Sequence, residues 1–493
     1  MKIRLLNPPQ KLAEKDVPLI SPPLSIMYIS AVLKERGYEA PIDDFLVSKE
    51  LQIKKEKNFS HLGWSWDKIR AYLQENKSDV VGVTNLFTSQ LEYALKLCEL
   101  VKEINPETKV IIGGPHASAF PEEILKHDFI DYVVVGEGEY VFADLIDAIK
   151  NNKDITGLAY KKGTKRAITN KLNPIEDLDK LPLPAYSEIN LENYFKVYKK
   201  GFESRPDCSS SPRVISMITS RGCPFDCVFC SIHGHMGKKY RVHSVDYVIK
   251  HIKFLKENYN IEHIHFEDDN LTLNVRRFEE ILDGLIEEKI NIKWDTPNGV
   301  RADKLNFRIL KKAKQSGCSR LKIAAESGDQ EILDKVIKKN LDLEEIKKVA
   351  KICQQLKIPL GCFFIFGVPG ETLKDIDTTF RFAYNLFKKY DVLPHFNQSR
   401  PSVGTELYDL SKEKGYIKNP SQGKYIQYDN PYIETEEFNM AQLRDKSNIF
   451  YRKIFFLHIW KLASNPSFSY RFFKFYGLNF GNLFRKALAY IQY

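Results

Sequence analysis

The sequence predicts an α/β protein, with a doubly wound parallel sheet first, six strand–helix units next and a helical C-terminal region last. Two observations predict this class. Apolar stretches of strand length alternate with segments of helical periodicity along most of the chain. The 493 residues, of which 43% are hydrophobic and 28% charged, suffice for two to four globular domains. We place the regions at 1–150, 151–205, 206–410 and 411–493.

The first region alternates strands with helices. The pattern predicts strands at 2–7, 38–42, 80–84, 109–112 and 132–135, and helices around 26–33 and at 91–104, 121–126 and 139–149. Such alternation favours a parallel, doubly wound sheet. In the second region, alternating residues at 156–169 predict a hairpin, and the proline-rich stretch 173–184 is typical of a linker.

The loops after the strands of the first region are candidates for ligand binding, because such sheets bind ligands at the carboxyl ends of their strands. Glycines there let the backbone approach a large planar or phosphate-bearing ligand. The candidate residues are Thr84, Gly113, Gly114, His116, Gly136 and Glu137. A dinucleotide fingerprint is absent, which disfavours NAD. These residues alone leave a response-regulator-like domain with tight turns equally open.

A cysteine-bearing loop follows the linker. The apolar run 214–218 predicts a buried strand, and Gly222 and Pro224 then begin a loop that carries Cys223, Cys227 and Cys230 in the spacing CxxxCxxC. Three thiolates can each hold one iron of a 4Fe–4S cluster, which leaves the fourth iron open to a substrate or cofactor. The alternative is a structural zinc site with His233 as the fourth ligand, although no second cysteine pair follows.

Five more strands follow this loop, each paired with a helical segment. The predicted strands are 263–267, 293–296, 320–324, 361–366 and 394–397, and the helices are 245–257, 277–288, 329–338, 343–356 and 372–387. With the strand before the cysteines this makes six units, which is fewer than a closed eightfold barrel needs.

Polar groups and glycines recur at the ends of these strands, where barrel active sites lie. Carboxylates at Asp268 and Asp269 can accept hydrogen bonds from an ammonium group, although one of them could instead cap the following segment. Glu326 could bond ribose hydroxyls, and Arg301 could pair with a carboxylate. Apolar residues before Gly367 and Gly370 suit a flat adenine ring.

The cysteine spacing, with Phe229 before the third cysteine, resembles the signature of the radical S-adenosylmethionine (SAM) superfamily. The GGPHAS and VVxGEGE patterns of the first region resemble the cobalamin-binding domain that precedes many radical SAM barrels. The resemblance covers roughly residues 1–410 and implies an open six-unit barrel. It assigns the SAM amino group to Asp268 and Asp269, ribose to Glu326, adenine to Gly367 and Gly370, and the SAM carboxylate to Arg301. The motif Asp-x-His-x-x-Gly is missing, so the resemblance implies base-off cobalamin without a protein histidine on cobalt.

This resemblance implies a cobalamin-dependent radical SAM enzyme with a 4Fe–4S cluster, SAM and cobalamin. Its family chemistry generates a 5′-deoxyadenosyl radical that removes hydrogen from an unactivated carbon, to which methylcobalamin supplies a methyl group. The expected substrate is a small molecule or lipid-like, and the reductant is a flavodoxin or ferredoxin. Oxidative cyclisation or rearrangement, as in the anaerobic porphyrin-ester cyclase group, is one alternative. A non-catalytic cobalamin sensor is an alternative of another class.

The remaining composition predicts a cytoplasmic protein with reduced thiols. The sequence shows no secretory signal, no apolar run of membrane-spanning length and no disulfide framework. The net charge of +10 does not by itself indicate nucleic acid. No acidic residue follows Asp445, and basic residues alternate with aromatic ones from there to the end. That segment could contact a membrane surface, or it could be a helical cap on the barrel.

Overall fold

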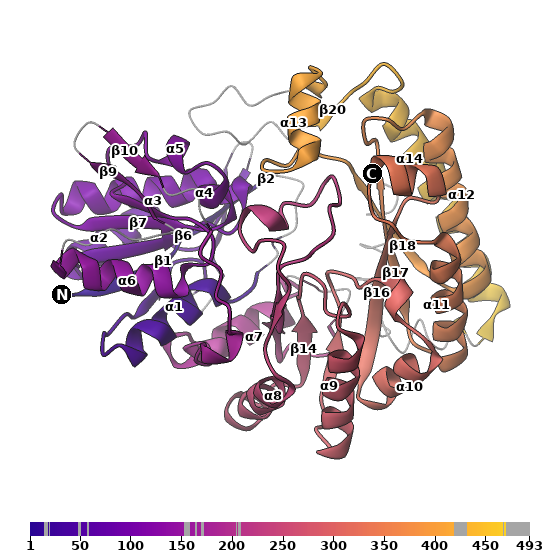
Figure 1. Cartoon of the computed structure of the whole chain (residues 1–493), viewed down its shortest axis with the longest axis horizontal. Helices are drawn as coiled ribbons and strands as arrows, with labels where there is room; N and C mark the ends of the chain where they lie inside the picture. The colour runs from indigo at the N-terminus through magenta and orange to yellow at the C-terminus, as the bar shows by residue number, and fades with distance from the viewer. Residues whose placement is uncertain are drawn as a thin grey trace. The chain divides into compact units, whose positions relative to one another are not determined.

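The computed structural model describes the chain except residues 14–17, 19, 48–50, 57–58, 152–157, 163–164, 169–171, 204, 206–208, 419–430, 467 and 470–493. The described residues form two compact units (Figure 1). Of the described residues, the first comprises those within Met1–Pro224 and Ser231–Asn270, and the second comprises Phe225–Cys230 and those from Leu271 on. The domain boundaries placed from the sequence stay predictions.

The first unit contains a seven-stranded sheet in the order β10-β9-β8-β7-β6-β1-β3. Five strands are parallel: β1 Ile3–Asn7, β3 Ile42–Asp44, β6 Val80–Thr84, β7 Lys109–Gly113 and β8 Tyr132–Val134. The predicted hairpin is formed by β9 Leu158–Lys162 and β10 Lys165–Ile168, and it extends the sheet because β9 pairs antiparallel with β8. The strand predicted at 38–42 begins later, at Ile42.

Helices cover both faces of this sheet, as the doubly wound prediction requires. On one face lie α2 Trp66–Glu75 and α3 Leu91–Ile104, and their apolar residues share a buried core with Leu6, Val83 and Ile112. Two helices that pack on each other, α1 Leu24–Glu35 and α6 Gly138–Asn151, belong to the other face, where Gly82 makes room for Phe142 and Leu5. Two short helices, α4 Pro115–Ala119 and α5 Pro121–Ile124, follow β7.

Sequence analysis missed several elements of the first unit. A small antiparallel sheet is formed by β2 Gln10–Ala13, β4 Ile53–Lys55 and β5 Phe59–Leu62. All three residues of β4 are exposed, so no apolar alternation marked it as a strand. Helix α2 and helix α7 Leu191–Lys199 were not predicted either.

The strand before the cysteines is β11 Val214–Met217, which pairs in parallel with β14 His263–Phe266. A two-stranded antiparallel ribbon, β12 Ser220–Arg221 and β13 Arg241–Val242, joins the two ends of the cysteine-bearing loop. Helix α8 Val245–Tyr259 leads from this ribbon to β14.

The second unit continues the strand–helix series with four parallel strands. These are β15 Lys293–Asp295, β16 Cys318–Glu326, β17 Leu360–Phe366 and β18 Leu393–Gln398, in chain order. The helices are α9 Val275–Glu287, α10 Phe307–Gln315, α11 Leu343–Leu356, α12 Leu373–Tyr390 and α13 Glu406–Glu413. Helix α10 was not predicted, and the helix predicted at 329–338 is a five-residue π-helical segment, Ile332–Val336. A short ribbon, β19 Ile417–Lys418 with β20 Tyr432–Ile433, precedes the last helix.

That last helix, α14 Met440–Ser464, packs against α12 (Figure 1). Phe450 stacks on Phe380 with 4.9 Å between ring centroids, and the buried Lys461 forms an ion pair with Asp391. This part of the basic, aromatic segment is therefore a cap on the second unit. The rest of the segment, from 470 on, lies outside the described residues. Among the described helices, none is long and apolar enough to cross a membrane.

Candidate active site

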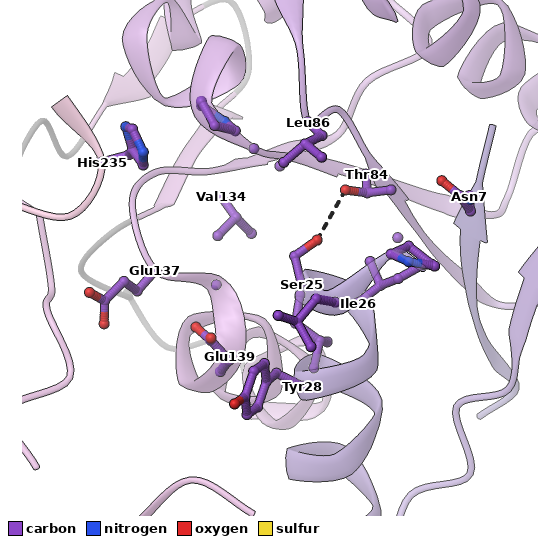
Figure 2. A pocket seen from close by; sticks show the side chains of 18 of the residues that line it. Asn7, Ser25, Ile26, Tyr28, Thr84, Leu86, Val134, Glu137, Glu139 and His235 are labelled. Carbon is purple, nitrogen blue, oxygen red and sulfur yellow. Dashed lines mark hydrogen bonds between the residues drawn. The ribbon is translucent and has the colours of Figure 1, made fainter. Parts of the chain in front are cut away.

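A cavity of about 360 Å³ lies at the carboxyl ends of β1, β6, β7 and β8 in the first unit (Figure 2). Thr84, Gly113, Gly114, Gly136 and Glu137 line it, and their predicted contact with cobalamin stays a prediction. Figure 2 shows Glu137 and His235 on one side of the cavity and Asn7 and Thr84 on the other. The hydroxyl oxygens of Thr84 and Ser25 are 3.3 Å apart.

Two adjacent glycines of the cavity serve different purposes. Gly114 has a φ of +123°, and a Cβ there would lie 2.0 Å from the main-chain oxygen of Asn85. The backbone of the neighbouring loop therefore requires this glycine, whatever the ligand. A Cβ on Gly113 would meet only Val134 at ordinary contact distance, 3.5 Å. Gly113 is thus the glycine at which a larger side chain has room to intrude on the cavity.

His116 was a candidate for ligand binding, but it is not among the residues that line the cavity. It lies buried on α4. Its Nδ1 is 3.2 Å from the hydroxyl of Thr88, and burial lowers the pKa of the imidazole to about 4. The histidine that lines the cavity is His235, whose pKa is also lowered, by burial. Sequence analysis missed His235, and only its position shortly after the third cysteine could have marked it.

Glu137 is engaged by arginines. Its Oε1 lies 2.5 Å from a terminal nitrogen of Arg241, and its Oε2 lies 3.4 Å from Arg221. Arg221 also forms an ion pair of 2.6 Å with Glu139. Both arginines were unmarked in the sequence, although they flank the cysteine loop. The carboxylate of Glu137 thus has two cationic partners within the protein, whereas the sequence suggested a cofactor contact.

The start of the cysteine loop is held tightly within the first unit. Gly222 has a φ of +81°, and a Cβ there would lie 2.3 Å from the oxygen of Lys239. The N–H of Cys223 donates to the carbonyl oxygen of Gly237 at 3.4 Å. His233 Nε2 lies 2.9 Å from the carbonyl oxygen of Cys223, so this nitrogen has a main-chain partner, which disfavours a zinc-ligand role for it.

The thiols of the loop differ from the other cysteines in exposure. Cys223 in the first unit, and Cys227 and Cys230 in the second, are all partly exposed. The other described cysteines, Cys98, Cys318, Cys353 and Cys362, are buried, and burial raises the pKa of each of these thiols. Accessible thiols in metal-ligand spacing fit an iron–sulfur cluster, whereas the buried ones are suited to packing.

The two aspartates after β14 hold the strand that leads to the cysteines. Asp268 Oδ1 accepts hydrogen bonds from the N–H and hydroxyl of Thr219, at 3.1 and 2.7 Å, and from the hydroxyl of Ser220 at 2.6 Å. Asp269 Oδ2 accepts from the N–H of Gly222 at 2.8 Å and lines the cavity. Burial raises the pKa of Asp269 from 3.8 to about 6. Their predicted contact with the SAM amino group stays a prediction.

In the second unit, Arg301 and Glu326 have partners within the protein. Arg301 donates to the carbonyl oxygens of Lys339 and Asn340 at 2.9 and 2.8 Å, and its guanidinium lies 3.8 Å from the ring centroid of Phe225. Glu326 has a φ of +67°, and its Oε1 forms a buried ion pair of 2.9 Å with Lys339. Positive φ in a non-glycine residue often marks functional sites. Their assignment to SAM stays a prediction.

Gly367 and Gly370 form the turn after β17. Both have positive φ, +79° and +104°, and a Cβ on Gly367 would lie 2.9 Å from Leu443. The turn is closed by the buried Glu371, which accepts a hydrogen bond from the N–H of Val368 at 2.7 Å. Burial raises the pKa of Glu371 to about 8. Contact of this turn with adenine stays a prediction.

Comparisons with known proteins agree with this arrangement. The sequence model of the radical SAM superfamily matches residues 217–383, and that of the B12 binding domain matches residues 13–146. Cytidylyl-2-hydroxyethylphosphonate methyltransferase of Streptomyces wedmorensis is 30% identical over 458 residues, which cover 86% of this chain and 84% of that protein. Anaerobic magnesium-protoporphyrin IX monomethyl ester cyclase of Rubrivivax gelatinosus is 23% identical and covers 92% of this chain and 77% of its own length.

A solved structure shares the fold. The cobalamin-dependent S-adenosylmethionine radical enzyme OxsB, with aqua-cobalamin and S-adenosylmethionine bound, aligns with a TM-score of 0.68 at 17% identity. The alignment covers 96% of this chain and 74% of OxsB. A B12-binding sheet precedes the CxxxCxxC loop and its strand–helix series in this chain. The chain therefore belongs to the cobalamin-dependent radical SAM enzyme family.

Proposed function

We propose that the protein methylates an unactivated carbon of a small-molecule or lipid-like substrate. One observation carries this proposal beyond family membership. Within a single compact unit, the same cavity is lined by the glycine loops of the B12-binding sheet and by Arg221 and Asp269, which lie at the base of the cysteine loop. A cofactor bound in this cavity would thus lie beside the chain segment that holds the cluster.

The residues of the cavity fit a large, flat ligand. Gly113 and Gly136 leave its edge without side chains, while Leu86 and Phe87 present apolar side chains that are 48% and 58% exposed. Exposed apolar groups beside a glycine-lined cavity suit a corrin ring. We infer that these residues hold cobalamin, and that Cys223, Cys227 and Cys230 hold the cluster. When bound, the cluster and SAM supply hydrogen abstraction from carbon, and cobalamin supplies the methyl group.

The protein's own residues position these groups and exclude water. Asp268 and Asp269 tie the strand before the cysteines to the end of β14. Of the two histidines near the glycine loops, His116 does not line the cavity and His235 enters it from the side of the cysteine loop. Because the motif Asp-x-His-x-x-Gly is missing, we expect base-off cobalamin with no axial protein nitrogen on cobalt. Electron paramagnetic resonance of the cob(II)alamin form tests this, since nitrogen superhyperfine splitting that vanishes in His235→Ala would assign an axial histidine instead.

The reaction is tested with the reconstituted protein under anaerobic conditions. Flavodoxin or ferredoxin is the reductant that the family implies, and a chemical reductant replaces either in the assay. Extracts of cells that lack the gene supply candidate substrates, and SAM carrying a CD₃ group marks the product by mass spectrometry. Methylation predicts a product heavier by one labelled methyl group, together with S-adenosylhomocysteine. The proposal fails if the protein cleaves SAM while no product acquires the label.

Oxidative cyclisation is the second candidate, favoured by the likeness to the magnesium-protoporphyrin ester cyclase over 463 residues. The same experiment separates the two reactions. A cyclase would give a product without the CD₃ label, whereas a methyltransferase consumes the methyl group of SAM. A non-catalytic cobalamin sensor would bind cobalamin and release no 5′-deoxyadenosine.

We further propose that α14 touches an anionic membrane surface. Ile449, Phe456, Ile459 and Trp460 are between 48% and 68% exposed on this helix, next to the exposed Arg452 and Lys453. Basic residues contribute roughly 1 kcal/mol each near an anionic bilayer, and aromatic side chains insert at its interface.

Liposome sedimentation tests this contact. Arg452→Glu with Lys453→Glu should release the protein from anionic vesicles, whereas Lys347→Glu with Lys348→Glu on α11 changes the charge equally and should not. Equal sedimentation of the two double variants would leave α14 as a cap only.

A further inference from the structure

Two arginines face each other at the base of the cysteine loop. Arg221 on β12 is the register partner of Arg241 on β13, and the residues between these strands include the first cysteine. Both side chains are buried, at 6% and 1% exposure. Like charges opposite each other on paired strands repel, and burial strengthens the repulsion. The ribbon therefore needs negative charge from elsewhere in the fold.

Two glutamates that follow β8 supply this charge, Glu137 from the loop and Glu139 from the first turn of α6; residues 132–140 are called the glutamate loop below. Glu137 bridges the arginines, with contacts of 2.5 and 2.9 Å to Arg241 and 3.4 Å to Arg221. Glu139 contacts Arg221 at 2.6 Å. Their side chains are also buried, at 1% and 7% exposure. The four-residue cluster is thus electrically balanced, with two cations and two anions.

Main-chain groups add hydrogen bonds to this cluster. Arg241 donates to the carbonyl oxygens of Ile175 and Met236, both at 2.8 Å, and Glu137 accepts from the N–H of Ile175 at 2.9 Å. A cluster that is paired and hydrogen-bonded in this way is held firmly, because separating one ion would leave a buried charge uncompensated. The glutamate loop and the ribbon at the base of the cysteine loop are therefore tied to each other by buried ion pairs.

This ion-pair cluster also borders the cavity. Gly136, Glu137, Gly138 and Glu139 line it from the sheet side, and Arg221 lines it from the ribbon. A ligand that restrains the glutamate loop restrains Arg221 through the ion pairs. Arg221 immediately precedes Gly222, whose N–H is fixed by Asp269, and Cys223 follows.

We infer that Glu137, Glu139, Arg221 and Arg241 are positioning residues that transmit occupancy of the cavity to the cysteine loop. Corrin binding thus orders the base of the loop on which the cluster is assembled. The inference rests on the proposed binding of cobalamin in this cavity, and it assigns these glutamates to positioning and not to chemistry.

Hydrogen–deuterium exchange tests this coupling, with hydroxocobalamin as the probe and the full chain without cluster as the sample. In the native protein, hydroxocobalamin should protect both the glutamate loop, 132–140, and the ribbon, 218–224 and 239–243. In Glu139→Gln, the glutamate loop should stay protected, whereas ligand-induced protection of the ribbon should fall by roughly tenfold, within the range of typical coupling between sites. If Glu139→Gln does not fold, Arg221→Lys replaces it as the test variant. This substitution keeps the positive charge but loses the contacts of the two guanidinium nitrogens with Glu137 and Glu139.

Arg4→Gln is the matched control, because it removes a partly buried arginine–aspartate pair of 2.8 Å in the same sheet, away from the cavity. It should leave ligand-induced protection of the ribbon unchanged. The inference is overturned if hydroxocobalamin protects the glutamate loop alone in the native protein. It is also overturned if hydroxocobalamin protects the ribbon equally well in the native protein, in Glu139→Gln and in Arg221→Lys. A native protein that takes up no hydroxocobalamin would instead refute the proposed function.

Discussion

Replacing Gly114 by alanine should destabilise the first unit strongly, for a reason that involves no ligand. The added Cβ would lie 2.0 Å from the oxygen and 2.8 Å from the carbonyl carbon of Asn85. Both atoms belong to the main chain, and the N–H of Asn85 is itself bonded to the oxygen of Gly113 at 2.9 Å. The loop therefore cannot yield without breaking that hydrogen bond.

The expected cost follows from these contacts. A backbone conformation of φ +123° and ψ 175°, which is essentially restricted to glycine, costs an alanine roughly 1–3 kcal/mol, and loss of the hydrogen bond costs about 1 kcal/mol more. We therefore expect the free energy of unfolding to fall by about 2–4 kcal/mol, which is a large part of the 5–15 kcal/mol typical of a domain. Urea denaturation followed by circular dichroism measures this difference.

Gly113 is the matched control, since alanine there meets only Val134 at 3.5 Å. Gly113→Ala should change the free energy of unfolding by less than about 1 kcal/mol. Gly113→Leu should fold and yet bind hydroxocobalamin weakly, because its side chain has room only toward the cavity. If Gly114→Ala were as stable as Gly113→Ala, the main-chain contact would not be what requires glycine at 114.

Three further predictions concern the charged and metal-binding groups. Replacing all three cysteines of the CxxxCxxC loop by alanine should abolish the brown chromophore and the binding of about four irons per chain, as iron analysis would show. Because the pKa of Asp269 is raised to about 6, its carboxyl binds a proton more tightly in the folded than in the unfolded chain. As the pH rises from 4 to 6, the free energy of unfolding should therefore fall by up to about 3 kcal/mol relative to that of Asp269→Asn. Parallel pH profiles of the two proteins would contradict this. Lys339→Met should cost about 3–5 kcal/mol by leaving Glu326 buried without its cation, and adding Glu326→Gln should recover much of that loss in urea titrations.

Local patterns were sufficient to predict most of the parallel strands and most of the longer helices, because apolar periodicity records which face of an element is buried. The strand before the cysteines and the helix at 91–104 follow this rule. Helix α10 was missed even though Ile309, Leu310 and Ala313 form a helical stripe, because its remaining residues are mostly basic. Strand β4 carries no stripe at all, since it is exposed along its whole length.

The partners of the site residues could not be predicted from the sequence, because they depend on contacts between distant segments. Asp268 binds residues 48 and 49 positions earlier in the chain. Arg241 meets Glu137 across 104 positions. A carboxylate at a strand end can face a ligand or tie down a neighbouring strand, and sequence position is the same in both cases. Both oxygens of Glu137 meet arginines that its position in the sequence does not indicate, while its predicted contact with a ligand stays a prediction.

This use of charged groups bears on how the cavity selects a ligand. Glu137, Glu139 and Arg221 line it, yet each is engaged by an ion pair within the protein. Much of the remaining wall is glycine backbone and apolar side chains such as Leu86 and Phe87. A wall of this kind recognises its ligand by shape, through van der Waals contact and main-chain hydrogen bonds, more than by charge. The buried charged residues then fix the position of the cavity wall relative to the base of the cysteine loop. Substitutions of these residues should therefore weaken the coupling between the cavity and the loop more than they weaken ligand binding in the cavity.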